Sequence, residues 1–225
     1  MPFAFIIVAF VLIAGVAMYF SHLAEKKRRE ELQAFAASRG WRYTPEADRN
    51  FPRVFRDFES LQRGSNRYAR HFIRGAVEDM GLTFCEYHYE TTSRNSEGKT
   101  STTHYWHTLL ILEPPFPLKE LRVRPEGIFD KLAAVFGGGD INFESAEFSR
   151  RFHVSAPDRS WAYAVIQPHI MDLLLRHPRR ELAMNGRCLM LKDNLSLNAA
   201  RLPGMERGGT EILRSIPAFA RPDAR

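Results

Sequence analysis

Cysteine is scarce in this chain of 225 residues, and its two copies, Cys85 and Cys188, lie far apart in the sequence. No CxxC pair and no Cys/His spacing of a zinc finger occurs, so the pattern excludes a thiolate zinc site and gives no sign of a disulfide framework. Each cysteine is expected to be a small buried hydrophobic residue. The scarcity also agrees with a reducing compartment.

Common catalytic and nucleotide-binding motifs are missing as well. HExxH, GxSxG, a Walker loop and an EF-hand loop do not occur, which excludes the signatures of zinc proteases, α/β-hydrolases, P-loop proteins and calcium sensors. The run Gly137-Gly138-Gly139 follows a predicted helix and is not followed by Gly-Lys-Ser/Thr, so it is expected to end that helix. The sequence therefore predicts no catalytic residue and no cofactor.

Charged side chains are absent from the first twenty-one residues, and Phe3–Phe20 is almost wholly aliphatic or Phe. At about 1.5 Å per residue a helix over this segment is roughly 27 Å long, close to the ~30 Å hydrocarbon core of a bilayer. The pattern predicts a transmembrane anchor at residues 1–21, and hence a single-pass membrane protein with the lipid bilayer as a partner.

The basic residues predict the orientation of this anchor. Lys26, Lys27, Arg28 and Arg29 follow the apolar segment, whereas only the α-amino group precedes it. The positive-inside rule then places the N-terminus outside and the C-terminal domain in the cytoplasm, at the inner membrane. A cleaved signal peptide is the alternative, although it requires positive charge before a shorter apolar stretch. No cysteine follows the apolar run, which excludes a bacterial lipoprotein.

The basic excess of the chain, formally +6, is concentrated near the predicted anchor. Residues 22–40 predict a charged helical stalk that ends at Gly40. Residues 39–74 contain nine arginines and only four acidic residues. A salt-bridged surface is the simplest interpretation; contact with anionic lipid headgroups comes second and nucleic acid third. The candidate membrane-surface residues are Lys26, Lys27, Arg28, Arg29, Arg39 and Arg42.

Strand and turn signals predict an α+β cytoplasmic domain over residues 41–194, with a mainly antiparallel sheet and packed helices. The predicted strands are Val54–Leu61, Arg67–Val77, Leu82–Thr91, His104–Leu112 and Leu118–Arg124, followed by a hairpin of Glu181–Met184 and Arg187–Lys192 around Asn185-Gly186.

Helix signals predict one helix over Gly127–Phe136, one after Asp158 as its N-cap, and one over Pro168–His177. Residues 195–225 predict a partly helical tail, interrupted at Pro203-Gly204 and Gly208-Gly209. Apolar phasing predicts that Phe148, Phe152 and Leu174 are buried in the core.

The predicted hairpin of Leu82–Thr91 and His104–Leu112 carries the one cluster of residue types suited to metal or proton chemistry. Alternation places even-numbered residues 84–90 on one face, and a loop centred near 96–97 puts His88 opposite 104–106. Glu86, His88, Glu90 and His104 would then converge, a set suited to Zn²⁺ or another first-row ion. The simpler interpretation is a polar outer face with cross-strand Glu–His pairs.

Short segments within residues 137–175 resemble those of a known protein family. They are Phe143-Glu144-Ser145, Glu147-Phe148, Arg151-Phe152-His153-Val154, Asp158 and the helix Pro168–Leu175, together with the entry Ser38–Tyr43. The chain resembles a family of uncharacterised bacterial proteins that have an N-terminal membrane segment and a cytoplasmic domain of unknown function. The resemblance implies kinship of fold and the anchor, and no activity.

These observations favour a non-enzymatic, membrane-anchored interaction or scaffold protein that binds a protein partner or the membrane surface. The alternative hypothesis is a membrane-tethered metal-dependent enzyme that uses Glu86, His88, Glu90 and His104. Binding to nucleic acid is the least favoured of the three.

Overall fold

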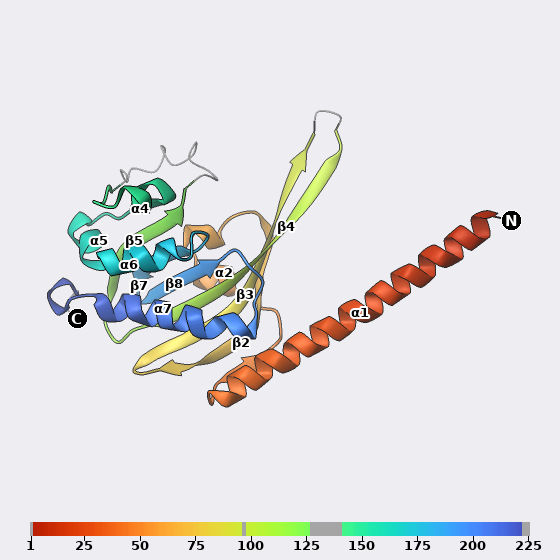
Figure 1. The fold of residues 1–225 in the computed structure, drawn as a ribbon, viewed down its shortest axis with the longest axis horizontal. Helices are drawn as coiled ribbons and strands as arrows, with labels where there is room; N and C mark the ends of the chain where they lie inside the picture. Colours follow the sequence, from red (N-terminus) through yellow and green to blue (C-terminus); the bar gives the residue numbers. More distant parts are fainter. Residues whose placement is uncertain (1, 96–97, 127–140, 222–225) are drawn as a thin grey trace.

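A single eight-stranded sheet forms the centre of the protein, as seen in a computed structural model that describes residues 2–95, 98–126 and 141–221, with side chains of the first helix from Leu12 onward. The strand order is β1-β2-β3-β4-β8-β7-β5-β6, and every neighbouring pair is antiparallel. The predicted α+β class is confirmed (Figure 1). The helix predicted over Gly127–Phe136 and the glycines after it lie outside the described residues.

A long helix opens the chain, four strands then follow one another from β2 to β5, and shorter helices and strands make up the rest. The strands are β1 (Arg42–Thr44), β2 (Ser65–Val77), β3 (Met80–Arg94), β4 (Thr100–Glu113), β5 (Leu118–Pro125), β6 (Phe152–Ser155), β7 (Glu181–Gly186) and β8 (Cys188–Asp193). The helices are α1 (Pro2–Ser38), α2 (Phe51–Val54), α4 (Ala146–Arg151), α5 (Arg159–Val165), α6 (Pro168–Leu175) and α7 (Leu202–Ser215), with 3₁₀ turns η1 (Glu59–Leu61), η2 (Ala199–Arg201) and η3 (Ala218–Ala220).

Both faces of the sheet are covered. Helices α4 to α7 and the end of α1 lie on one face (Figure 1), over a large apolar core that includes Phe148, Phe152 and Leu174, each at most 1 % exposed. Their predicted burial is confirmed. The segment of α2 and η1 covers the opposite face, where Tyr87 and Leu109 belong to a smaller cluster. The β3–β4 hairpin therefore has no solvated face along its inner half.

Several local signals act as the sequence predicts. Asp158 caps α5 by accepting a hydrogen bond from the backbone N–H of Trp161. Ser145, which was not predicted as a cap, caps α4 in the same way through the N–H of Phe148. Pro168 lies in the first turn of α6, where its missing N–H costs nothing. Gly40 ends α1 at φ 67°, and Gly186 turns the β7–β8 hairpin at φ 58°.

Two predicted elements are wrong. Val54–Leu61 is not a strand, because Pro52 starts helix α2 and the following residues turn to cover the smaller core. Helix α7 runs without interruption through both glycine sites. A Cβ atom on Gly209 would lie 2.9 Å from Leu112 Cδ1, so this glycine lets α7 pack closely against the sheet.

Helix α1 is continuous, as the predicted anchor and stalk require, but the predicted membrane anchor itself is wrong. In the described part of the chain no helix combines the length and the apolar character needed to cross a membrane. This finding overturns the anchor predicted at residues 1–21, with its single-pass topology and inner-membrane location. The side chains of residues 1–11 lie outside the described part.

Candidate functional site

Strands β3 and β4 pair in one unbroken register, from Gly81 opposite Glu113 to Arg94 opposite Thr100. In this register His88 faces Trp106, and Glu90 faces His104. Because neighbouring side chains alternate along a strand, these four lie on the same face. The predicted alternation and the predicted cross-strand neighbours are confirmed.

Three of the four predicted ligands meet on this face. His88 Nε2 lies 3.2 Å from His104 Nδ1, and His104 Nδ1 lies 3.3 Å from Glu90 Oε1. His88 Nε2 and Glu90 Oε1 are 3.9 Å apart. The side chain of His88 is almost fully buried, that of Glu90 is 18 % exposed and that of His104 is 56 % exposed. The cluster therefore opens to solvent on the side of His104.

Asn66 of β2 holds two members of the cluster in place. Its backbone carbonyl accepts a hydrogen bond from His88 Nδ1 at 3.1 Å, and its side-chain Nδ2 donates to Glu90 Oε1 at 2.6 Å. Arg49 Nη1 donates to Asn66 Oδ1 at 2.9 Å. A guanidinium only donates, so the amide oxygen of Asn66 faces Arg49 and its nitrogen faces Glu90.

Asn66 reaches this position because β2 bulges. The strand gains one residue against β3 between Ser65 and Tyr68, and Asn66 lies there at φ 48°. A bulge re-aims the side chains around it, and here it sets Tyr68 opposite His88. Asn66 was not predicted from the sequence. Its one available signal was the residue type, because asparagine is among the few that tolerate a positive φ.

Aromatic rings enclose His88. Its ring centroid lies 4.3 Å from that of Trp106 and 4.8 Å from that of Tyr68. Burial lowers the pKa of His88, and the hydrogen bond to Asn66 and the charge of Glu90 only partly oppose it. His88 is thus neutral at pH 7. Since its Nδ1–H donates to a carbonyl, Nε2 carries a lone pair directed at the cluster.

Glu86, the fourth predicted ligand, belongs to a different cluster. It is 1 % exposed, and its Oε1 accepts from Arg28 Nη2 at 2.5 Å and from the backbone N–H of Leu197 at 3.2 Å. Its Oε2 accepts from Arg70 Nε at 2.9 Å. The four-residue site is therefore not assembled. Glu86 instead ties α1, β2 and the segment after β8 to the centre of the sheet.

The six predicted membrane-surface residues are mostly engaged within the chain. Arg39 pairs with Glu206 of α7 at 3.2 Å, and Arg42 lies on the edge strand β1, opposite Arg74. The other four form ion pairs along α1, which are Lys26–Glu30, Lys27–Glu31, Arg28–Glu25 and Arg29–Glu25. This arrangement fits the salt-bridged interpretation of the basic segment.

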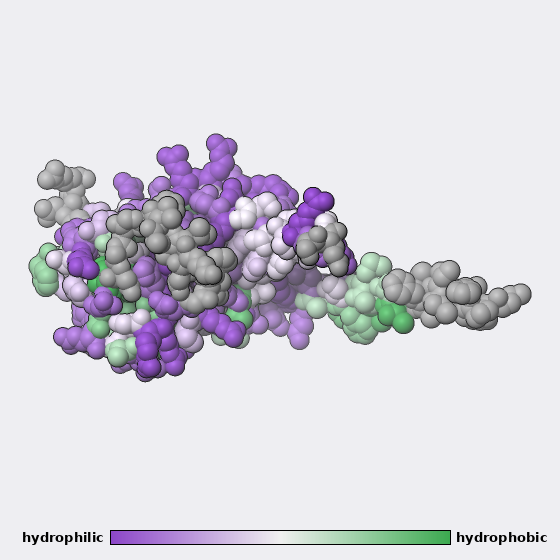
Figure 2. All heavy atoms as spheres, turned by 90° about the horizontal axis from the view of Figure 1, so that it is seen from above, coloured by the Kyte–Doolittle hydropathy of each residue, from purple (hydrophilic) through white to green (hydrophobic). Residues whose placement is uncertain are grey.

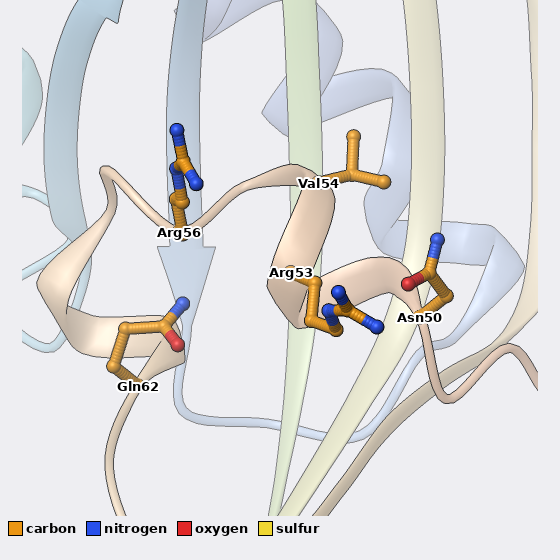
Figure 3. A pocket seen from close by; sticks show the side chains of 5 residues that line it. All are labelled: Asn50, Arg53, Val54, Arg56 and Gln62. Atoms are coloured by element: carbon orange, nitrogen blue, oxygen red, sulfur yellow. The ribbon is translucent and has the colours of Figure 1, made fainter.

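A shallow surface hollow lies away from the cluster. Its volume is about 370 Å³, and it is lined by Asn50, Arg53, Val54, Arg56 and Gln62. Figure 3 shows Arg56 and Gln62 standing apart from Asn50 and Arg53. Gln62 Nε2 already donates a hydrogen bond to the carbonyl oxygen of Pro52, at 2.8 Å. No set of side chains in this hollow converges on a point where a ligand would be held.

His107 occupies the opposite face of the hairpin from His88. It is 5 % exposed and stacks on Tyr89, with ring centroids 5.4 Å apart. Burial, helped by the positive charge of Lys192, lowers the pKa of His107 to about 3. The imidazole of His107 therefore stays neutral in the folded protein at neutral and mildly acidic pH.

His107 should make the fold sensitive to mild acid. Between pH 6.5 and about 3 the unfolded chain binds a proton at His107 that the folded chain does not, so the free energy of unfolding falls as the pH is lowered. From pH 7 to pH 5 this residue should account for a loss of about 2 kcal/mol. Urea unfolding should show a drop smaller by that amount in His107→Phe, while the exposed His169→Phe keeps the full drop. Equal pH dependence in all three proteins would contradict the prediction.

Comparison with known proteins was uninformative at the level of sequence, since no family model and no curated protein matches the chain. Among solved structures, the fold is similar to the crystal structure of the mycobacterial trehalose monomycolate transport factor A, TtfA. The TM-score is 0.54 at 12 % identity, over 88 % of this chain and 97 % of TtfA. At that identity the similarity concerns the fold alone, and it assigns no role to His88, Glu90 or His104.

Proposed function

We propose that this protein is a non-enzymatic interaction factor that binds a partner polypeptide through the projecting end of the β3–β4 hairpin. This end, the hairpin arm, comprises Thr91–Arg94 and Thr100–Thr103. Its support is that the hairpin continues well past the rest of the sheet (Figure 1). Strand β2 pairs with β3 only as far as Glu90, and β8 pairs with β4 only as far as Thr108. Among the described strands, none pairs with the outer edges of the arm.

The hairpin arm is not explained by the stability of the fold. All of its side chains are exposed, and most are Thr or Ser, so it buries no apolar surface. A two-stranded ribbon is marginally stable in water by itself. Its edges present unpaired N–H and C=O groups, which a strand from another polypeptide can complete. Strand addition to the arm would explain both its length and its composition.

Helix α1 offers a second surface for contacts. Its described N-terminal part exposes large apolar side chains, among them Leu12, Ile13, Tyr19 and Phe20 at 62–69 %. Figure 2 shows this apolar part standing clear of a largely hydrophilic body. Contiguous exposed apolar residues mark interaction surfaces. These exposed side chains of α1 support a role in binding a partner, because they do not contribute to the core of the fold.

The similarity to TtfA agrees with an accessory role, since TtfA is by name a transport factor. The substrate in its name is not transferred to this chain. The alternative of a metal-dependent enzyme is less well supported, because Glu86, one of its four predicted residues, is engaged by Arg28 and Arg70.

Shortening the hairpin tests this proposal. Replacing residues 92–102 by Asn-Gly joins Thr91 to Thr103 through a two-residue turn and keeps Glu90 opposite His104. We expect the urea midpoint to be unchanged, because the arm buries no apolar surface. We also expect the shortened protein no longer to bind its partner. The readout is photo-crosslinking in cells from a benzophenone amino acid in place of Ser101 of the full chain, compared with the same group in place of the exposed Arg207.

The expected result is a discrete adduct from position 101 and none from position 207. In addition, an adduct formed from a third probe at the exposed Thr91 should disappear in the shortened protein. Adducts that form equally from positions 101 and 207, or that persist after shortening, would refute the proposal.

A further inference from the structure

We infer that His88, Glu90 and His104 form a binding site for one divalent transition-metal ion of the Zn²⁺ type, at the point where the hairpin arm leaves the sheet. The inference stands on the geometry of these side chains and does not depend on the proposed function. Each residue directs one ligand atom at the others, and the three atoms lie within 4.8 Å of one another.

The spacing of the three atoms fits tetrahedral coordination. Zn²⁺ binds imidazole nitrogen and carboxylate oxygen at about 2.0–2.2 Å, so two ligand atoms of a tetrahedral site are about 3.3–3.6 Å apart. The observed separations are 3.2, 3.3 and 3.9 Å. A circle through three atoms at these separations has a radius of about 2.0 Å, so an ion just outside their plane reaches all three at bonding distance.

The surroundings orient the ligands as the outer shell of a metal site does. A ligating histidine usually donates its second ring N–H to a carbonyl or carboxylate. His88 does so to the carbonyl of Asn66, which leaves Nε2 free to ligate. The ligating carboxylate is itself hydrogen-bonded, because Asn66 Nδ2 donates to Glu90. One residue in a bulge with positive φ thus orients two of the three ligands.

Hydrogen bonds within the cluster use the same atoms that would bind the ion. His104 Nδ1–H can donate to His88 Nε2, while Glu90 Oε1 accepts from Asn66 Nδ2. A cation at the common centre would replace the hydrogen bond between the two histidines, and the proton of His104 would move to its exposed Nε2.

The ligand set also selects the class of metal. Two imidazoles and one carboxylate suit Zn²⁺, Co²⁺, Ni²⁺ or Cu²⁺, whereas Mg²⁺ and Ca²⁺ prefer six or more oxygen ligands. Three protein ligands leave a fourth position, and the exposed side of His104 opens it to water. Such an ion would crosslink β3 to β4 and stiffen the root of the hairpin arm.

Titration of the metal-free full chain with Zn²⁺, followed by calorimetry in excess Mg²⁺, tests the site. We expect one equivalent to bind. Co²⁺ added in place of Zn²⁺ should give the visible absorption bands of tetrahedral coordination, a signature that a merely structural role of these residues would not produce. His104→Ala and Glu90→Gln should each weaken binding at least about 100-fold, because each removes a direct ligand.

Two further variants sharpen the test. Asn66→Gly keeps the positive φ and the carbonyl that orients His88, but removes the amide that orients Glu90, and should weaken binding about 10- to 100-fold. His169→Ala removes an exposed histidine elsewhere and should leave the affinity unchanged. His104 is itself exposed, so its variant is expected to fold. Absence of 1:1 binding, or equal affinity in the wild type, His104→Ala and Glu90→Gln, would overturn the inference.

Discussion

Replacing Glu86 by alanine should lower the free energy of unfolding by about 3–5 kcal/mol and loosen the end of helix α1 from the sheet. Glu86 is buried and neutralises two guanidinium groups, Arg28 from α1 and Arg70 from β2. Without it, Arg70 loses the carboxylate with which it pairs, and Arg28 keeps the pair with Glu25 at 3.7 Å. The loss should appear as a lower urea midpoint, and hydrogen exchange over residues 25–38 should accelerate.

Two comparisons separate charge from packing at this site. Glu86→Gln keeps the shape of the side chain and should still cost several kcal/mol, because the two arginines lose the charge of Glu86. Glu113→Ala removes an exposed carboxylate from the same hairpin and should change the free energy of unfolding by less than about 0.5 kcal/mol. Wild-type stability in Glu86→Gln would show that the ion cluster does not hold α1.

Phe152→Ala should cost a similar amount, about 3–5 kcal/mol, for a different reason. Phe152 is 1 % exposed and stacks on Phe148 with ring centroids 5.1 Å apart. Both rings lie where α4 and β6 meet the main core. Truncation leaves a cavity that close-packed neighbours fill only in part. Chemical denaturation of the full chain at pH 7 measures the loss.

A matched aromatic residue provides the control for this truncation. Phe219 is 89 % exposed in the turn after α7, so Phe219→Ala should stay within about 0.5 kcal/mol of the wild type. Comparable losses from both truncations, or none from Phe152→Ala, would refute the assignment of Phe152 to the core.

The alternation of the β3–β4 hairpin was readable from the sequence because strand periodicity is a local property. Even-numbered residues around His88 do share a face, and the central loop does place His88 opposite Trp106. The cap at Asp158 and the turn at Gly186 could be predicted for the same reason, since their geometry depends on a few neighbouring residues.

The partners of the site residues could not be read locally. Glu86 pairs with Arg28 across 58 residues of sequence, so alternation alone placed it beside His88 as a ligand. Asn66 reaches Glu90 only because β2 bulges, and a bulge arises from pairing with another strand. Burial of both faces depends on α7 and α2, whose packing no single segment predicts. The composition of the N-terminal segment likewise predicted a span that the described helix does not provide.

The two bulges of β2 restrict which changes of chain length this protein tolerates. The extra residues at Asn66 and His71 keep Tyr68 and Arg70 facing the same side as His88 and Glu86. A one-residue deletion between them would turn one of these side chains to the wrong face of the sheet. Deletion of one residue from each strand of the hairpin arm, in matched positions, would shorten only exposed chain. Among descendants of this sequence, insertions and deletions should therefore accumulate at the hairpin tip and be absent from residues 66–71.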